Sequence, residues 1–278
     1  MKKKIKLAVK IIFIVSAVII IFNKININEL KKVSLSSPFY LVLAFVFYNI
    51  SQIVSALRIH NYLKEVQITP AFKDQLILYY LGMFYNTILP GGIGGDAYKA
   101  YTFQKAFKTG YRQIIKALLI DRVSGLFAIL AIIGVLILFS NLKGFFVYIS
   151  ALIVLAPLGV YLFHRYFFKE FKKPSWKNFI YSIVIQTLQG AAFYMILLSL
   201  GVNSHIIDFL VLFFISSVIS VIPVSVGGVG LRELTFLWGL EYLHLNPALG
   251  VVSAFLFFII TVVSSAIGIF FLKHKLGE

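Results

Sequence analysis

Residues 89–101 read LPGGIGGDAYKAY and residues 223–233 read PVSVGGVGLRE, and each sequence interrupts a long apolar stretch with a cluster of glycines. The two interrupted stretches run from 75 to 107 and from 206 to 245. Glycine in a helix interior is destabilising, so neither stretch is expected to form one straight helix. We predict instead that each consists of two shorter helices joined by a tight turn.

The composition around these clusters is that of an integral membrane protein. Hydrophobic residues make up 60% of the 278-residue chain and charged residues 13%, against roughly 45–50% and about 25% in soluble domains. Apolar runs occur along the whole length, so we expect one membrane domain, 1–278, without a separate soluble core. The net charge of +16 comes from short basic clusters between apolar runs, which is typical of membrane topology and not of a nucleic-acid-binding face.

Six further apolar runs are long enough, or nearly so, to cross a hydrocarbon core that needs about 20 helical residues. They are residues 7–22, 38–57, 114–139, 145–163, 178–200 and 248–272. The basic and apolar N-terminus is interpreted as a retained first span, because no small-residue cleavage pattern follows it. Irregular backbone at membrane depth must pack in protein or line a wet cavity, so the two glycine clusters are predicted to form re-entrant hairpins.

The distribution of basic residues supports the hairpins, because a full span and a re-entrant hairpin place the following loop on opposite sides of the membrane. With six spans, two hairpins and both termini in the cytoplasm, 21 of the 26 lysines and arginines lie on the cytoplasmic side. The exceptions are Lys24, Lys31, Lys32, Lys143 and Arg232. We therefore predict a multi-pass protein of the cell (cytoplasmic) membrane.

The two halves of the chain are related by an offset of 136 residues, the distance from Gly91 to Gly227. This offset carries each predicted span and hairpin of the first half, about 7–139, onto one in the second half, about 145–272. Each half has three spans, an odd number, so the second half starts on the opposite side of the membrane. We predict an all-α fold of two inverted-topology repeats, which in many transporters places the substrate site near the midplane.

Backbone N–H groups in a glycine turn, together with a helix starting near Ala97, form a nest for an anion such as a phosphate headgroup. The structural alternative is a tight turn with Asp96 as the N-cap. Charged side chains near the centre of a span cost about 2.5–3.5 kcal/mol on insertion scales, so they need a partner or a function. We predict that Lys99 and Arg122 contact a lipid phosphate, which Asp96 and Asp121 help to orient.

Arg232 and Glu233 are the predicted outer counterparts, and local ion pairing or snorkelling is the alternative for all these charges. The full predicted substrate-binding set is Gly91, Gly92, Gly94, Gly95, Asp96, Lys99, Asp121, Arg122, Gly227, Gly228, Gly230, Arg232 and Glu233.

Four amides occur as two pairs within predicted spans, Asn49 with Gln52 and Gln186 with Gln189, and the pairs are 137 residues apart. Each pair lies on one helical face, where it would form interhelical hydrogen bonds or line a polar groove. The five histidines have no metal-ligand spacing and the chain has no cysteine, so no metal site is predicted. No catalytic residues and no cofactor are predicted either.

With LPGGIGGDAYKAY at 89–101, DRVSGL at 121–126 and PVSVGGVGLRE at 223–233, the chain resembles the transmembrane region of lysylphosphatidylglycerol synthases, a family of flippase-like membrane proteins. In those synthases this region moves aminoacylated phosphatidylglycerol between leaflets, and a separate soluble domain makes the lipid. The resemblance therefore implies lipid transport. Since no such domain precedes the last residue, Glu278, we do not expect an enzyme.

Together, the residues and the resemblance predict a membrane lipid translocase, flippase-like or scramblase-like, that moves an anionic or aminoacylated phospholipid between leaflets. Two alternatives stay open: translocation of a polyprenyl-phosphate-linked sugar, and a non-transporting role as a lipid-binding partner of a lipid or glycan synthase. The expected partners are membrane lipids, bound through their phosphate headgroups, and a membrane-bound synthase, but not nucleic acid.

Overall fold

The computed structural model describes residues 33–88, 94–142, 144, 147–167, 176–221 and 228–274, and within these ranges the regular structure is helical, without strands. The all-α prediction is confirmed for this part of the chain. The predicted first span at 7–22 and the predicted site residues Gly91, Gly92 and Gly227 lie outside the described residues.

Within the described ranges, four helices are long and apolar enough to cross a bilayer. They are α3 (Phe39–Glu65), α6 (Tyr111–Leu136) with the 3-10 segment Ile137–Phe139, α9 (Trp176–Ser199), and α12 (Pro247–Ala266) with the 3-10 segment Ile267–Phe271. They correspond to the spans predicted at 38–57, 114–139, 178–200 and 248–272.

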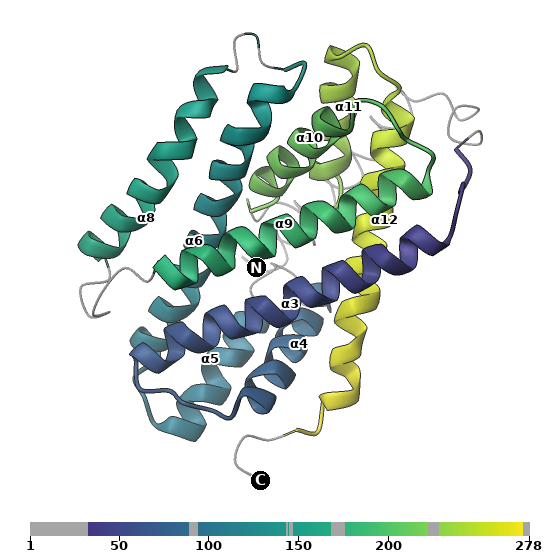
Figure 1. Ribbon diagram of the computed structural model, residues 1–278. Helices are drawn as coiled ribbons and strands as arrows, with labels where there is room; N and C mark the ends of the chain where they lie inside the picture. The colour runs from purple at the N-terminus through teal and green to yellow at the C-terminus, as the bar shows by residue number, and fades with distance from the viewer. Residues whose placement is uncertain are drawn as a thin grey trace, which may run out of the picture.

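The span predicted at 145–163 corresponds to a 3-10 segment, Val147–Ala151, followed by helix α8 (Leu152–Phe167). Figure 1 shows α8 beside α6 at the edge of the molecule. With 16 residues, α8 alone is shorter than the roughly 20 residues that a perpendicular crossing needs.

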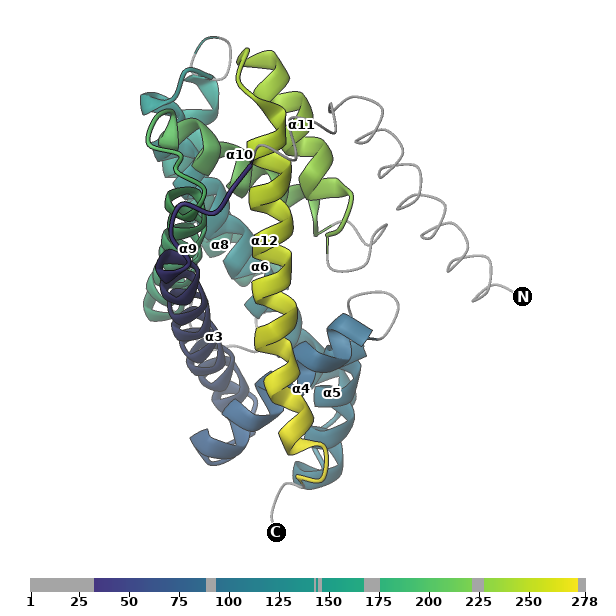
Figure 2. The same cartoon turned by 90° about the vertical axis from the view of Figure 1, so that its right-hand side faces the viewer.

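Two pairs of short helices flank the glycine clusters. Helices α4 (Phe72–Ile88) and α5 (Gly94–Phe107) contain 17 and 14 residues, and α10 (Ile206–Ile219) and α11 (Leu231–Tyr242) contain 14 and 12. Each is shorter than a straight membrane crossing. Figures 1 and 2 show α4 packed beside α5 at one end of the molecule, and α10 beside α11 at the other.

Helices α3 and α9 pack side by side along one face of the molecule and run in opposite directions (Figures 1 and 2). At one end the Ser36 N–H donates to the Ser199 carbonyl over 2.7 Å, and at the other end the Asn61 amide donates to Asn178 over 3.0 Å. Helices α6 and α12 are also antiparallel (Figures 1 and 2). The helix bounds follow the 136-residue offset, since α3, α4, α5 and α6 shifted by 136 overlap α9, α10, α11 and α12.

Buried side chains form different cores in the two halves. Between α9, α10, α11 and α12 the core is aromatic: Phe193 stacks on Phe213 and Phe236 at centroid separations of 4.5 and 5.4 Å, and Phe257 packs edge-on against Phe213. Between α3, α4, α5 and α6 a second cluster is built mainly from aliphatic residues around the fully buried Phe103. One member of this second cluster, Leu118, also lines the cavity described below.

Helices α4 and α5 touch backbone to backbone where Gly82 faces Gly95. A Cβ atom at Gly95 would overlap the Gly82 carbonyl, and a Cβ at Gly82 would lie 2.8 Å from Cε of Lys99. Because neither Gly82 nor Gly95 has a Cβ atom, α4 and α5 can pack at backbone contact. The same absence leaves space for the aliphatic part of the Lys99 side chain beside Gly82.

The Gly95→Ala substitution should force α5 away from α4, because the new methyl group meets backbone atoms that cannot rotate aside. Overpacking of this kind destabilises by about 1–3 kcal/mol. We expect a lower midpoint of thermal unfolding in detergent, followed by circular dichroism. The control is Gly110→Ala, where a Cβ meets no atom within 4 Å, and equal midpoints for the two variants would contradict the close crossing.

Candidate functional site

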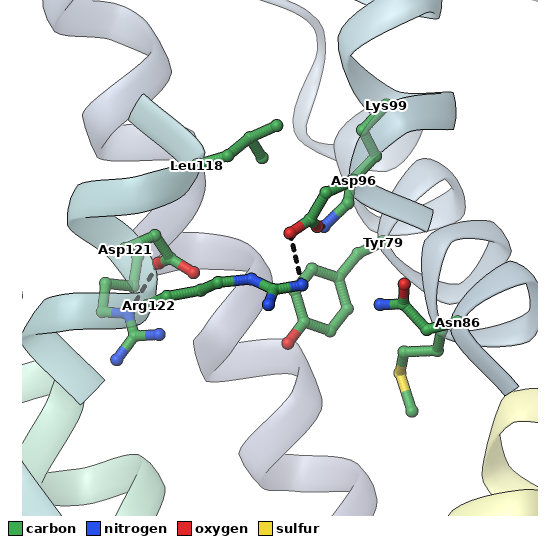
Figure 3. Close-up of a pocket in the computed structure, with 9 residues that line it drawn as sticks. Tyr79, Asn86, Asp96, Lys99, Leu118, Asp121 and Arg122 are labelled. Atoms are coloured by element: carbon green, nitrogen blue, oxygen red, sulfur yellow. Dashed lines mark hydrogen bonds and ion pairs between the residues drawn. The ribbon is translucent and has the colours of Figure 1, made fainter. Parts of the chain in front are cut away.

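A cavity of about 200 Å³ lies between α3, α4, α5 and α6. It is lined by Arg58, Tyr79, Met83, Asn86, Asp96, Lys99, Leu118, Asp121 and Arg122. Figure 3 shows two groups of these side chains facing each other, with Tyr79, Asn86, Asp96 and Lys99 from the α4–α5 pair on one side and Leu118, Asp121 and Arg122 from α6 on the other. Five of the nine are charged, which is unusual among helices that are otherwise apolar.

The Asp96 carboxylate is shared by two cations. Its Oδ1 atom lies 2.9 Å from Lys99 Nζ, one turn further along α5, and its Oδ2 atom lies 2.5 Å from Nη2 of Arg122. Figure 3 shows Arg122 extending from α6 across the cavity to Asp96. Because α5 begins at Gly94, Asp96 lies in its first turn, and its side chain ties the hairpin to α6.

A second ion pair joins α3 to α6 at the same cavity. Arg58 Nε lies 2.7 Å from Oδ1 of Asp121, and Nη1 of Arg58 donates to the Ser182 hydroxyl of α9 over 2.8 Å. The side chains of Arg58 and Asp121 are only 7% and 14% exposed. The sequence did not predict Arg58 as a site residue, because a basic residue at the end of an apolar run is usual at the membrane interface. Its partner, Asp121, is 63 residues away in the sequence.

Helix α4 contributes three further lining residues that sequence reasoning missed, namely Tyr79, Met83 and Asn86. Tyr79 lies under Lys99, whose Nζ atom is 5.2 Å from the ring centroid, within the range of a cation–π contact. Asn86 accepts a hydrogen bond from the Gly95 N–H over 2.8 Å, so this predicted nest N–H is engaged by a side chain. Tyr79, Met83 and Asn86 follow one another at spacings of four and three, the signal of a single helical face.

The predicted amide pairs lie inside the helix bundle. Asn49 donates to the Ser264 hydroxyl of α12 over 2.9 Å and accepts from Tyr80 of α4 over 3.0 Å, so it forms interhelical hydrogen bonds. Gln52 accepts a longer hydrogen bond, 3.4 Å, from the hydroxyl of Tyr79. Gln52 therefore contacts a residue that lines the cavity but does not line it itself. Gln186 is buried and Gln189 half-buried on α9.

The second glycine cluster has a different local structure. Gly228 and Gly230 adopt φ values of +83° and +86°, which glycine tolerates better than other residues. The Gly230 N–H donates to the Glu233 carboxylate over 2.7 Å, so Glu233 caps α11. Glu233 therefore makes a capping contact at the start of its own helix.

Arg232 is held between aromatic rings. Its guanidinium carbon lies 5.2 Å from the Phe257 centroid and 5.7 Å from that of Phe213, and Nη1 donates to Ser217 over 3.1 Å. Neither Arg232 nor Glu233 lines the charged cavity. The structure thus brings together Asp96, Lys99, Asp121 and Arg122 and leaves the second motif apart from them.

The cavity is suited to binding an oxyanion. Charge-assisted hydrogen bonds from arginine and lysine to phosphate oxygens are roughly twice as strong as neutral ones. Arg122 is 45% exposed at its side chain, so the cationic wall is reachable from outside the cavity. Within the described residues, no group of three histidines or carboxylates is placed to hold a metal ion.

Residues 7–176 and 172–268 match the family model described as Lysylphosphatidylglycerol synthase TM region. No curated protein matches the chain.

Removing one member of the Arg58–Asp121 pair should destabilise the fold. Breaking a buried ion pair leaves an uncompensated charge and costs about 3–5 kcal/mol. We expect Arg58→Gln and Asp121→Asn each to lower the denaturation midpoint in detergent, and the double variant to be more stable than the sum of the two effects predicts. Arg112→Gln, at an exposed position on α6, is the control. Strict additivity would show that the pair does not couple α3 to α6.

Proposed function

We propose that this chain, which belongs to the lysylphosphatidylglycerol synthase TM region family, is a translocase that moves a phospholipid between the leaflets of the membrane. Family membership and the four long apolar helices make it a multi-pass membrane protein. The observation that carries the proposal is the shared Asp96 carboxylate, which holds Lys99 and Arg122 together at a cavity between otherwise apolar helices.

The proposed topology has six spans and two re-entrant hairpins in two inverted repeats. The antiparallel course of α3 and α9 supports it, as does the position of the α4–α5 and α10–α11 pairs at opposite ends (Figure 1). None of these four hairpin helices is long enough to cross the bilayer unaided.

Basic residues indicate which end faces the cytoplasm. Lys64, Lys73, Lys105, Lys108 and Arg112 all lie on or beside the connections around the α4–α5 hairpin. By the positive-inside rule this end is cytoplasmic. His274, the last described residue, is also at this end, because its Nε2 atom lies 3.0 Å from Oδ1 of Asp74 in the first turn of α4. The charged cavity is therefore assigned to the cytoplasmic side, and so is the C-terminus.

A headgroup would enter this cavity from the cytoplasmic leaflet. Its phosphate would receive hydrogen bonds from Arg122 and Lys99, in partial exchange for those that the Asp96 carboxylate accepts. The cavity of about 200 Å³ is smaller than the roughly 300–1,000 Å³ typical of small-molecule sites, so only the headgroup is enclosed and the acyl chains stay in lipid. Rocking of the two repeats would then change the side of access. No covalent step is assigned to the site.

The direct test is reconstitution in liposomes that contain lipids labelled on an acyl chain, with the accessible label measured over time after addition of a membrane-impermeant reductant. We expect the protein to accelerate loss of the inner-leaflet label, and Arg122→Gln and Lys99→Gln to slow it about tenfold or more, since each removes a charge-assisted hydrogen bond of about 1.5–3 kcal/mol.

The Arg112→Gln variant is the control for charge removal away from the cavity, and its rate should equal that of the natural protein. If the natural protein accelerates exchange of no lipid, translocation is wrong and a lipid-binding role is left. If both cavity variants transport at the natural rate, translocation does not use this cavity.

A further inference from the structure

A buried carboxylate joins the two repeats at the end of the molecule opposite the charged cavity. Asp208 lies in the first turn of α10, and its side chain is 2% exposed. Its Oδ1 atom accepts from the backbone N–H of Asn141 and its Oδ2 atom from the side-chain amide of Asn141, both over 2.7 Å. The Nδ1 atom of His205 lies 3.1 Å from the same Oδ2 atom. The outer cluster, as we call these three residues, is on the extracytoplasmic side in the proposed topology.

The outer cluster crosses the boundary between the repeats. Asn141 follows the 3-10 segment that continues α6, so it belongs to the first repeat, whereas His205 and Asp208 belong to the second. A carboxylate withdrawn from water needs hydrogen-bond donors, and two of those that Asp208 has come from the other repeat. Asn141 and His205 are themselves exposed, so water can replace these bonds when the repeats separate.

Helix α6 is held at both of its ends by an aspartate of a hairpin. At the cytoplasmic end Arg122 pairs with Asp96 in the first turn of α5, and beyond the other end Asn141 bonds to Asp208 in the first turn of α10. The two points on the α6 side are 141 minus 122, or 19, residues apart, which is about 30 Å at the helical rise. One continuous helical segment, Tyr111–Phe139, therefore connects the contacts to both hairpins.

The two ends differ in how accessible they are. At the cavity the Arg122 side chain is 45% exposed, whereas at the opposite end the Asp208 side chain is 2% exposed. Next to Asn141, Ser140 and Leu142 are also buried, at 2% and 6% exposed. The structure is thus reachable at the cytoplasmic end and closed at the outer cluster.

We propose that the outer cluster is a latch that keeps the extracytoplasmic side closed while the cavity is open to the cytoplasm. Its release lets the α10–α11 hairpin separate from α6 and opens a path to the outer leaflet. Because α6 is held at both ends, the same movement closes the cytoplasmic cavity. The inference rests on the proposed function, since alternating access is what a translocase of two inverted repeats requires.

The test measures accessibility at both ends with single cysteines in a chain that has none. Ser140→Cys reports on the outer cluster, and Leu118→Cys reports on the cavity that Leu118 lines. Each is labelled with a membrane-impermeant thiol reagent in vesicles of known orientation, Ser140→Cys from the outside and Leu118→Cys from the cytoplasmic side.

The latch is weakened by Asp208→Asn, which removes the charge and replaces one acceptor oxygen with an amide group that cannot accept. We expect labelling of Ser140→Cys to become at least tenfold faster and labelling of Leu118→Cys to become at least twofold slower. Asn141→Ala removes the side-chain bond and keeps the backbone one, so it should shift both rates in the same directions by less.

The matched control is Asn203→Ala, an exposed amide on the connection before α10, which should leave both rates unchanged. Asn141→Ala also guards against misfolding, because its side chain is exposed and the carboxylate stays in place. A purely structural role predicts a different pattern, since local loosening speeds labelling at Ser140→Cys alone and general unfolding speeds it at both positions.

The outcomes separate the latch from translocation, provided that lipid exchange by the natural protein is measured in vesicles of the same composition. Opposite changes at the two cysteines support the latch, and if no lipid exchanges they do so while overturning the proposed function. Lipid exchange with the two labelling rates unchanged, or changed in the same direction, overturns the latch and keeps translocation. A faster rate at Ser140→Cys with no change at Leu118→Cys also overturns it, because the two ends are then not coupled.

Discussion

The ion-pair cluster at Asp96 is the interaction on which the rest of the site depends. A charge between apolar helices needs a partner, and one carboxylate here serves a lysine on its own helix and an arginine on the next one. It lies where it does because Gly82 and Gly95 allow α4 and α5 to touch, with Asn86 holding the Gly95 N–H. The close crossing of α4 and α5 and the start of α5 thus place Asp96 where it pairs with both cations.

The two halves share a helix layout but not a chemistry. At the 136-residue offset, Asp96 corresponds to Arg232 and Asp121 to Phe257. In place of the charged cavity, the second half has an aromatic core against which Arg232 lies. A lipid held at the cytoplasmic side would thus leave a charged cavity and pass toward an aromatic half. An interior-negative potential favours outward movement of an anionic lipid by about 2.3 kcal/mol per 100 mV.

The sequence predicted most helices within a few residues. The length of an apolar run and the position of a glycine cluster both depend only on neighbouring residues, so they can be read without knowing the fold. Of the site, the sequence predicted Asp96, Lys99, Asp121 and Arg122, since a charge within or beside an apolar run is conspicuous. It missed Arg58, which looks like an ordinary basic residue at a span end until folding brings Asp121 to it. Tyr79 and Asn86 were missed because a tyrosine and an asparagine on a short helix do not reveal which face is covered. Glu233 was grouped with the substrate-binding charges, although its spacing from Gly230 also suits a helix cap.

The central claim is that the cavity between α3 and α6 opens to the cytoplasm and receives a phosphodiester headgroup. It is tested most directly with Leu118→Cys, which lines the cavity and would be the single thiol in a chain without cysteine. In vesicles of known orientation, a membrane-impermeant thiol reagent should label this position only from the cytoplasmic side, and short-chain phosphatidylglycerol should slow the labelling. Labelling from the outside, or a rate that the lipid does not change, would contradict the account.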